Sequence, residues 1–171
     1  MVDDVTNKNF LSPLNFKFQL KRAPHVNFFI QKINVPGIAL PYAEATNPFI
    51  NVPYGGDHLQ YETLDITFRV DEDLQNYLEI HNWLRSQGKI NFIDYKNLAE
   101  AQPFTGEGLK SDISLTVLTS NKRANYEIVF KDAFPVKISD MNFDTSDEDI
   151  NYIEASASFR YVFYDISKVN G

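Results

Sequence analysis

Residues 61–88 show the clearest arrangement of hydrophobic and polar positions in the chain. Apolar side chains alternate with polar ones from Leu64 to Val70, which predicts a strand with one buried face. Acidic residues follow at 71–73, and apolar residues then recur at helical spacing. This second pattern predicts a helix that begins at Asp71, whose carboxylate would cap a free backbone N–H, and ends at Gly88 in the left-handed conformation.

The predicted helix is the only long one in the sequence, and we expect it to pack across an antiparallel sheet. One stripe of its surface would be buried, with His81 in it as a hydrogen-bonded core histidine. The stripe comprises Leu74, Tyr77, Leu78, His81 and Leu84, widened by Ile80 and Trp83.

Alternation predicts further strands at 15–20, 26–35, 89–95, 112–119, 126–130, 136–141 and 153–164. Residues 112–130 form the clearest hairpin, and Phe134-Pro135 is expected to break the chain after it. The apolar run Phe28–Ile30 indicates a strand centre that is covered on both sides. The strand at 153–164 would span roughly 37 Å at ~3.4 Å per residue, which favours a sheet that continues past one small domain.

Residues 36–60 combine proline with exposed-looking apolar side chains. They hold four of the eight prolines, so regular structure cannot run far through them. A monomer that exposed their apolar residues would tend to aggregate. The segment is either a long hairpin folded back onto its own domain or, as we favour, an arm that lies on a neighbouring subunit. The arm residues are Ile38, Leu40, Tyr42, Phe49, Ile50, Val52 and Tyr54.

These patterns predict a mainly β (α+β) fold, an antiparallel β-sandwich or barrel with one flanking α-helix. The polar residues 1–14 would form an N-terminal arm, and residues 15–171 a single domain that carries the extended hairpin arm at 36–60. The chain has no cysteine, which excludes disulfides and thiolate metal sites. It shows neither a bilayer-spanning apolar run nor a signal peptide, so we expect a soluble product that stays in the cytoplasm after synthesis.

Charge and candidate chemistry narrow the function. The formal net charge is -7 and the basic residues are scattered, which argues against a protein that grips DNA. The three histidines are far apart in the sequence. Residues 144–149 are acidic but lack the ligand order of a calcium loop, and Gly106-Glu107-Gly108 does not complete a phosphate-binding motif. Asp132 and Asp140 stand in no catalytic pattern, so we predict no enzyme, cofactor or metal.

The order of several segments resembles the tail tube proteins of contractile-tailed, T-even-type bacteriophages. The resemblance spans most of residues 15–165. It is carried by Val35-Pro36-Gly37-Ile38, by residues 50–57 (INVPYGGD), by residues 61–68 (YETLDITF) with the acidic entry to the helix, and by Phe134–Ile138 with Met141–Asp144 and Ala155–Tyr164.

The resemblance implies a structural virion protein. In this family, hexameric rings join their sheets into a continuous barrel around a channel and stack into the inner tail tube, the conduit for DNA ejection. A long hairpin arm and an N-terminal arm bridge neighbours. Partners would be further copies of the chain and the tail sheath, tape-measure and baseplate proteins. DNA would pass through without specific binding, and a negatively charged wall would repel it. The protein would reside in the virion, after assembly in the host cytoplasm.

The faces that would line the channel are assigned to the polar sides of two strands, although an outer, sheath-facing surface would show the same pattern. The candidates are Asp65, Thr67, Arg69, Glu154, Ser156, Ser158 and Arg160. Within the same class, the alternatives are a single-layer baseplate initiator or tube-terminator ring and a type VI secretion-like tube protein. From other classes, the alternatives are a β-barrel that binds a small apolar ligand and a hydrolase that uses scattered carboxylates.

Overall fold

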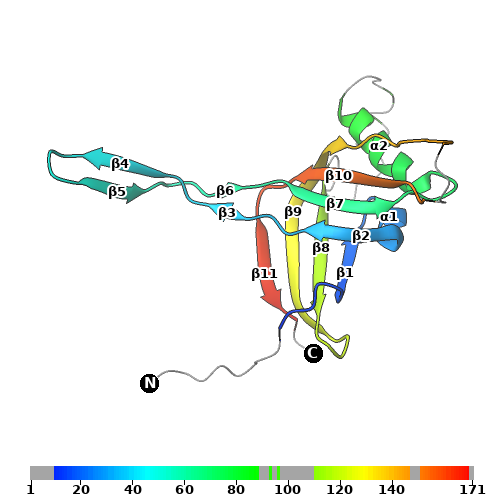
Figure 1. The fold of residues 1–171 in the computed structure, drawn as a ribbon, viewed down its shortest axis with the longest axis horizontal. Coiled ribbons are helices and arrows are strands. Elements are labelled where there is room, and N and C mark those ends of the chain that lie inside the picture. Colours follow the sequence, from blue (N-terminus) through cyan, green and yellow to red (C-terminus); the bar gives the residue numbers. More distant parts are fainter. Residues whose placement is uncertain (1–9, 89–92, 94–95, 97–109, 147–150, 170–171) are drawn as a thin grey trace.

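The computed structural model describes residues 10–88, 93, 96, 110–146 and 151–169 (Figure 1). These residues form mostly antiparallel sheet with few helices, as predicted. The predicted strand at 89–95, the loop around 106–108 and most of the N-terminal arm lie outside the described residues.

One group of strands runs vertically in Figure 1 and contains the predicted hairpin. It consists of β1 (Phe16–Leu20), β8 (Ser111–Leu118), the first part of β9 (Ala124–Ile138) and β11 (Tyr164–Lys168). Strand β8 pairs with β1 on one side and β9 on the other, and β11 pairs with the far side of β9. The predictions of a strand at 15–20 and a hairpin over 112–130 are therefore confirmed.

A second group of strands runs across the first. It consists of β2 (Ile30–Asn34), β7 (Leu64–Arg69), β10 (Glu154–Arg160) and the last part of β9. Strand β7 lies between β2 and β10, and β10 pairs with residues 134–138 of β9. Because β9 belongs to both groups, the two faces that meet between them enclose one core.

Alternate residues of both groups fill this core, as the period of two requires. The face of β7 predicted to be buried is buried, and Phe159 on β10 contacts Trp83 with ring centroids 6.0 Å apart. The large core side chains with almost no exposure are Leu20, Val26, Leu64, Ile66, Phe68, Ile80, Ile113, Phe130 and Phe159.

Strand β9 continues through the predicted break at Phe134-Pro135. Among the described strands, only β10 pairs with this part of β9, and a strand with one open side tolerates a proline. The chain bends just before, at Asp132, whose φ of 53° lies in the left-handed region. Asp112 on β8 holds this bend, because its carboxylate accepts hydrogen bonds from Lys131 Nζ (2.7 Å) and from the Asp132 N–H (3.1 Å).

The predicted long strand at 153–164 is two strands. Strand β10 ends at Arg160 and β11 begins at Tyr164, so the expected 37 Å strand and the inference drawn from its length are wrong. The physical reason is the bend of β9: β10 follows its last part, β11 follows its first part, and the chain between them turns with it. Tyr161 at this turn remains buried, whereas Phe163 is exposed.

The predicted strand at 26–35 begins as a helix. Helix α1 (Pro24–Phe29) precedes β2, with proline at the first turn, where its missing N–H costs nothing. Phe28 is 83 % exposed, so the expectation that this apolar run is covered on both sides is also wrong. Glu79 holds the helix to its neighbour: its carboxylate accepts a hydrogen bond from the His25 N–H (3.2 Å) and pairs with His25 Nδ1 (2.5 Å).

Helix α2 (Gln75–Gln87) confirms the predicted helix but begins later than Asp71. Leu74, with a φ of 57°, precedes it, and no side chain caps it. Instead the fully buried Asn76 joins helix and strand: its Nδ2 donates to the Arg69 carbonyl (2.7 Å) and its Oδ1 accepts from the Asp71 N–H (3.3 Å). The helix ends at Gly88 as expected, although with a right-handed φ of -68°.

The buried stripe of α2 is rotated from the predicted one. Asn76, Ile80, Trp83 and Ser86 are buried, while Leu78 is partly exposed. His81 is exposed on this helix, so its prediction as a core histidine is wrong.

Candidate assembly surfaces

Residues 38–61 form a narrow two-stranded projection, which Figure 1 shows extending away from the body. Strand β3 (Ile38–Ala39) pairs with β6 (Gln60–Tyr61), and β4 (Tyr42–Thr46) pairs with β5 (Asn51–Gly55). We call residues 38–61 the arm. This hairpin is not folded back onto its own body, because nearly all of its residues are exposed.

The apolar residues singled out by the sequence lie along the arm in contact with little else. Phe49 at its tip is 95 % exposed, and Val52 is half-buried between the strands. The other exposed apolar residues of this set are Ile38, Leu40, Tyr42, Ile50 and Tyr54. Burying such side chains is favourable by ~25 cal/mol per Å² of apolar surface, so the arm has the composition of a contact surface without its partner.

Two tyrosines hold the base of the arm, and sequence reasoning missed them. The Tyr164 hydroxyl donates to the Pro36 carbonyl (3.1 Å), where the arm leaves the body, and the Tyr161 hydroxyl donates to the Glu62 carbonyl (2.8 Å), where it returns. Tyr61 packs against both rings with centroids 5.9 and 5.7 Å away. Burial raises the pKa of Tyr161 to about 12. The sequence analysis missed this role because it placed Tyr161 and Tyr164 in one predicted strand at 153–164.

Gly56 closes the hairpin at its base. Its N–H donates to the Pro41 carbonyl at 2.7 Å, and a Cβ at Gly56 would come within 2.4 Å of that carbonyl oxygen. Only a residue without a side chain permits this approach, which sets how β4 and β5 leave the base.

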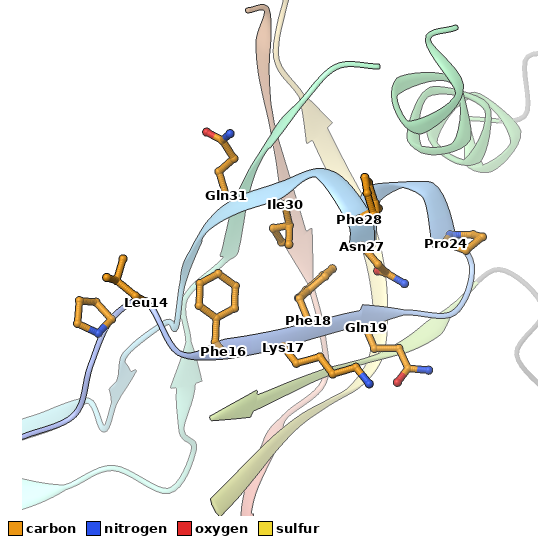
Figure 2. A pocket seen from close by; sticks show the side chains of 11 residues that line it. Leu14, Phe16, Lys17, Phe18, Gln19, Pro24, Asn27, Phe28, Ile30 and Gln31 are labelled. Atoms are coloured by element: carbon orange, nitrogen blue, oxygen red, sulfur yellow. The ribbon is translucent and has the colours of Figure 1, made fainter. Parts of the chain in front are cut away.

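A groove of about 790 Å³ lies between β1 and the α1–β2 segment (Figure 2). Phe16, Phe18 and Ile30 point into it from its two sides, and Phe28 stands at its rim. Among the described residues that line it, Lys17 is the only charged one. The sequence did not reveal this groove, because it predicted residues 26–30 as a strand.

The predicted channel-lining residues of β7 and β10 lie together on one face. Antiparallel pairing sets Glu154 opposite Arg69, Ser156 opposite Thr67, and Ser158 opposite Asp65. Residues directly opposite share a face, and the Ser158 hydroxyl donates to Asp65 Oδ1 at 2.6 Å. Arg160 continues the face at the end of β10 and is exposed.

Neighbouring strands extend this polar face and change its charge. Lys32 on β2 lies opposite Thr67, and Lys137 on β9 lies opposite Ser158. Together with Arg69 and Arg160, these make four basic side chains against the two acidic ones, Asp65 and Glu154. The face is therefore locally basic within a chain of net charge -7, and the expectation that a negative wall repels DNA does not follow from it.

The described residues show little that could perform chemistry. No group of three or more His, Asp or Glu side chains among them could hold a metal ion. Asp144, from the acidic loop, accepts hydrogen bonds from the Ser146 N–H (2.8 Å) and hydroxyl (2.6 Å), which lower its pKa and make a local turn. Residues 147–149 lie outside the described part. No helix in the described part is long and apolar enough to cross a membrane.

The fold is shared with chains from contractile injection systems. The chain is similar to a chain in the anti-feeding prophage baseplate, with a TM-score of 0.62 and 13% identity, over 98% of this chain and 97% of that one. It is also similar to a chain in the sheath–tube complex of an extracellular contractile injection system, with a TM-score of 0.60 and 12% identity over 95% and 94% of the two chains.

Sequence comparison shows the family. Residues 5–167 match the model of the phage tail tube protein family, and the chain belongs to that family. It is 24% identical over 142 residues to the tail tube terminator protein of Enterobacteria phage T4, which covers 81% of this chain and 76% of the relative. The family consists of structural tail components, in agreement with the predicted resemblance and with the prediction that the chain is not an enzyme.

Proposed function

We propose that this chain is the subunit of a hexameric ring in the inner tail tube of a contractile-tailed phage, and that such rings stack into the conduit for DNA ejection. The observation that carries the proposal is the arm: a paired ribbon with exposed apolar side chains, anchored at both of its ends by tyrosine hydroxyls. A single copy gains nothing from this arrangement, whereas a ring buries it. The anti-feeding prophage baseplate structure, which carries six-fold symmetry, supports the ring size.

The polar face of β7 and β10 is the proposed channel lining. A wall of short hydroxyls and paired charges offers DNA no apolar surface. Dissolved salt would screen the charge of its excess basic groups beyond ~8–10 Å. Ser156 is exposed at the centre of this face. Ser156→Cys labelled with a small gold cluster should place density on the ring axis in negative-stain images; density at the outer rim would assign this face to the sheath.

The remaining partners follow from the same proposal. The sheath would contact the outside of the ring, the tape-measure protein would fill the channel before ejection, and the baseplate would bind one end of the stack. The N-terminal arm at 1–14 would bridge neighbouring copies. Assembly would take place in the host cytoplasm before incorporation into the virion.

Removing the arm tests the proposal directly. Because the Gly56 N–H already bonds the Pro41 carbonyl, residues 42–55 can be replaced by a two-residue Asn-Gly turn. Wild-type protein should form rings or tubes by light scattering and negative-stain microscopy. The shortened chain, which lacks β4 and β5, should be a monomer that still unfolds in one cooperative thermal transition. A wild-type chain that remains monomeric at all concentrations and in the presence of preformed tubes would contradict the proposal.

A second candidate function is the terminator ring at the end of the tube, which the similarity to the T4 tube terminator favours. A terminator forms one layer and stops growth, whereas a tube subunit polymerises. Adding the purified chain to growing tubes distinguishes the two: single rings bound at tube ends would identify a terminator, and lengthening tubes would identify a tube subunit.

A further inference from the structure

The groove between β1 and α1 exposes an open sheet edge. The Asn15 carbonyl accepts the Leu118 N–H (2.9 Å), so the backbone groups of residues 15, 17 and 19 face β8. Those of residues 16, 18 and 20 therefore face the groove. At Leu20, Asn27 satisfies them, with hydrogen bonds of 2.8 and 3.2 Å. Among the described residues, the backbone groups of Phe16 and Phe18 have no such partner.

Strand β4 of the arm carries the matching open edge. The bonds from the Gly56 N–H to the Pro41 carbonyl and from the Asn47 N–H to the Ile50 carbonyl set the alternation of the ribbon. The backbone groups of Tyr42, Glu44 and Thr46 consequently point outward from β4. The outer edge of β5 is less suitable, because Pro53 occupies its centre and has no N–H.

The faces of the two strands also match, in one direction of pairing. On β1 the apolar Phe16 and Phe18 face the groove interior, and Lys17 faces outward. On β4 the small Ala43 and Ala45 share a face with Val52 and Tyr54, whereas Glu44 lies on the other face. In a parallel pair, a residue whose backbone N–H and C=O point toward the other strand lies opposite a residue whose backbone groups point away from it. Phe18 would therefore lie opposite Ala45, and Lys17 opposite Glu44. An antiparallel pair would set Glu44 against the phenylalanines.

We propose that β4 of one copy adds as a parallel strand to β1 of the next copy, with Phe16 opposite Ala43, Lys17 opposite Glu44 and Phe18 opposite Ala45. The chain cannot do this to itself, because its arm extends away from the body that carries the groove (Figure 1). The contact joins two different surfaces, so it is head-to-tail, and such a contact gives a ring when the rotation between successive copies closes. This inference rests on the proposed function and identifies the surface that receives the arm.

The absence of cysteine from the chain makes a cross-linking test clean. The variant Lys17→Cys/Glu44→Cys, treated with a short thiol-reactive cross-linker, should give a ladder of covalent oligomers that ends at the ring size. The matched control is Thr116→Cys/Glu44→Cys, because Thr116 lies opposite Lys17 one strand further from the groove. This control should give no ladder.

Charge reversal provides an independent measurement. Lys17→Glu and Glu44→Lys should each raise the protein concentration needed for assembly roughly fivefold, and the double reversal should restore it. Rings that form without the 17–44 cross-link and without this rescue would overturn the inference while leaving the proposed function standing. The same holds if Lys17→Cys/Asp4→Cys cross-links instead, since the N-terminal segment would then occupy the groove. A wild-type monomer would overturn the proposed function itself.

Discussion

The Tyr164 hydroxyl donates a hydrogen bond of 3.1 Å to the Pro36 carbonyl, and so connects β11 to the point where the arm leaves the body. The Tyr161 hydroxyl makes the corresponding bond of 2.8 Å to the Glu62 carbonyl, which lies between β6 and β7 where the arm returns to the body. Tyr161 lies in the turn between β10 and β11, and Tyr164 is the first residue of β11; this turn follows the bend of β9. The direction of the arm is therefore coupled to the core.

Removing these hydroxyls should loosen the arm more than it destabilises the body. Tyr161→Phe and Tyr164→Phe should each lower the free energy of unfolding by about 1 kcal/mol, the usual contribution of one hydrogen bond. The pKa of Tyr161 is raised to about 12, so the stability it contributes should be present below pH 10 and lost between pH 10 and 12. Urea unfolding of wild type and Tyr161→Phe across this pH range measures the difference. If both proteins lose the same free energy of unfolding between pH 10 and 12, the raised pKa of Tyr161 is contradicted.

A methyl group at Gly56 should redirect the arm. The Cβ of Gly56→Ala would approach the Pro41 carbonyl oxygen within 2.4 Å, so the hairpin base must shift. We expect ring assembly to weaken at least severalfold while the thermal midpoint of the body changes little. Gly55→Ala is the matched control, because a Cβ there meets only Leu40 Cδ2 at 3.8 Å. Equal assembly of the two variants would show that the close approach at Gly56 does not matter.

Replacing Asn76 should be the most destabilising of these substitutions. Asn76→Ala leaves the Arg69 carbonyl and the Asp71 N–H without their partner in a fully buried position. Each of these two unsatisfied groups costs roughly 1–3 kcal/mol, so the free energy of unfolding should fall by about 2–6 kcal/mol. Asn82→Ala on the exposed side of the same helix is the control for helix propensity and should change it by less than about 1 kcal/mol.

The contact between α1 and α2 should depend on pH. The hydrogen bond and charge of Glu79 raise the pKa of His25 above its ordinary 6.5. A raised pKa means that the contact contributes fully below pH 6.5 and is lost as the pH rises through the folded-state value. An NMR titration should show a raised His25 pKa in wild type that returns toward 6.5 in Glu79→Gln. An unshifted wild-type value would show that the pair does not form.

Local patterns could predict the elements that keep the same side buried along their whole length. The alternation in β7 and β8 and the helical spacing of α2 report burial on one side only. The family resemblance likewise depends on residues in sequence order. The apolar residues of the arm were also identifiable from a local pattern, because prolines and apolar side chains occur together within one continuous segment of the sequence.

Tertiary contacts decided the rest. Phe28-Phe29-Ile30 has no period of its own, and the proline at 24 and the hold of Glu79 on His25 make its first part a helix. Pro135 remains in a strand because, among the described strands, β9 pairs on one side only at this point. One predicted strand became β10 and β11 because β9 bends at Asp132. The groove beside β1 and the tyrosines at the arm base join residues that are far apart in the chain. A sequence pattern records the periodicity of burial within one element, whereas these features depend on which elements meet.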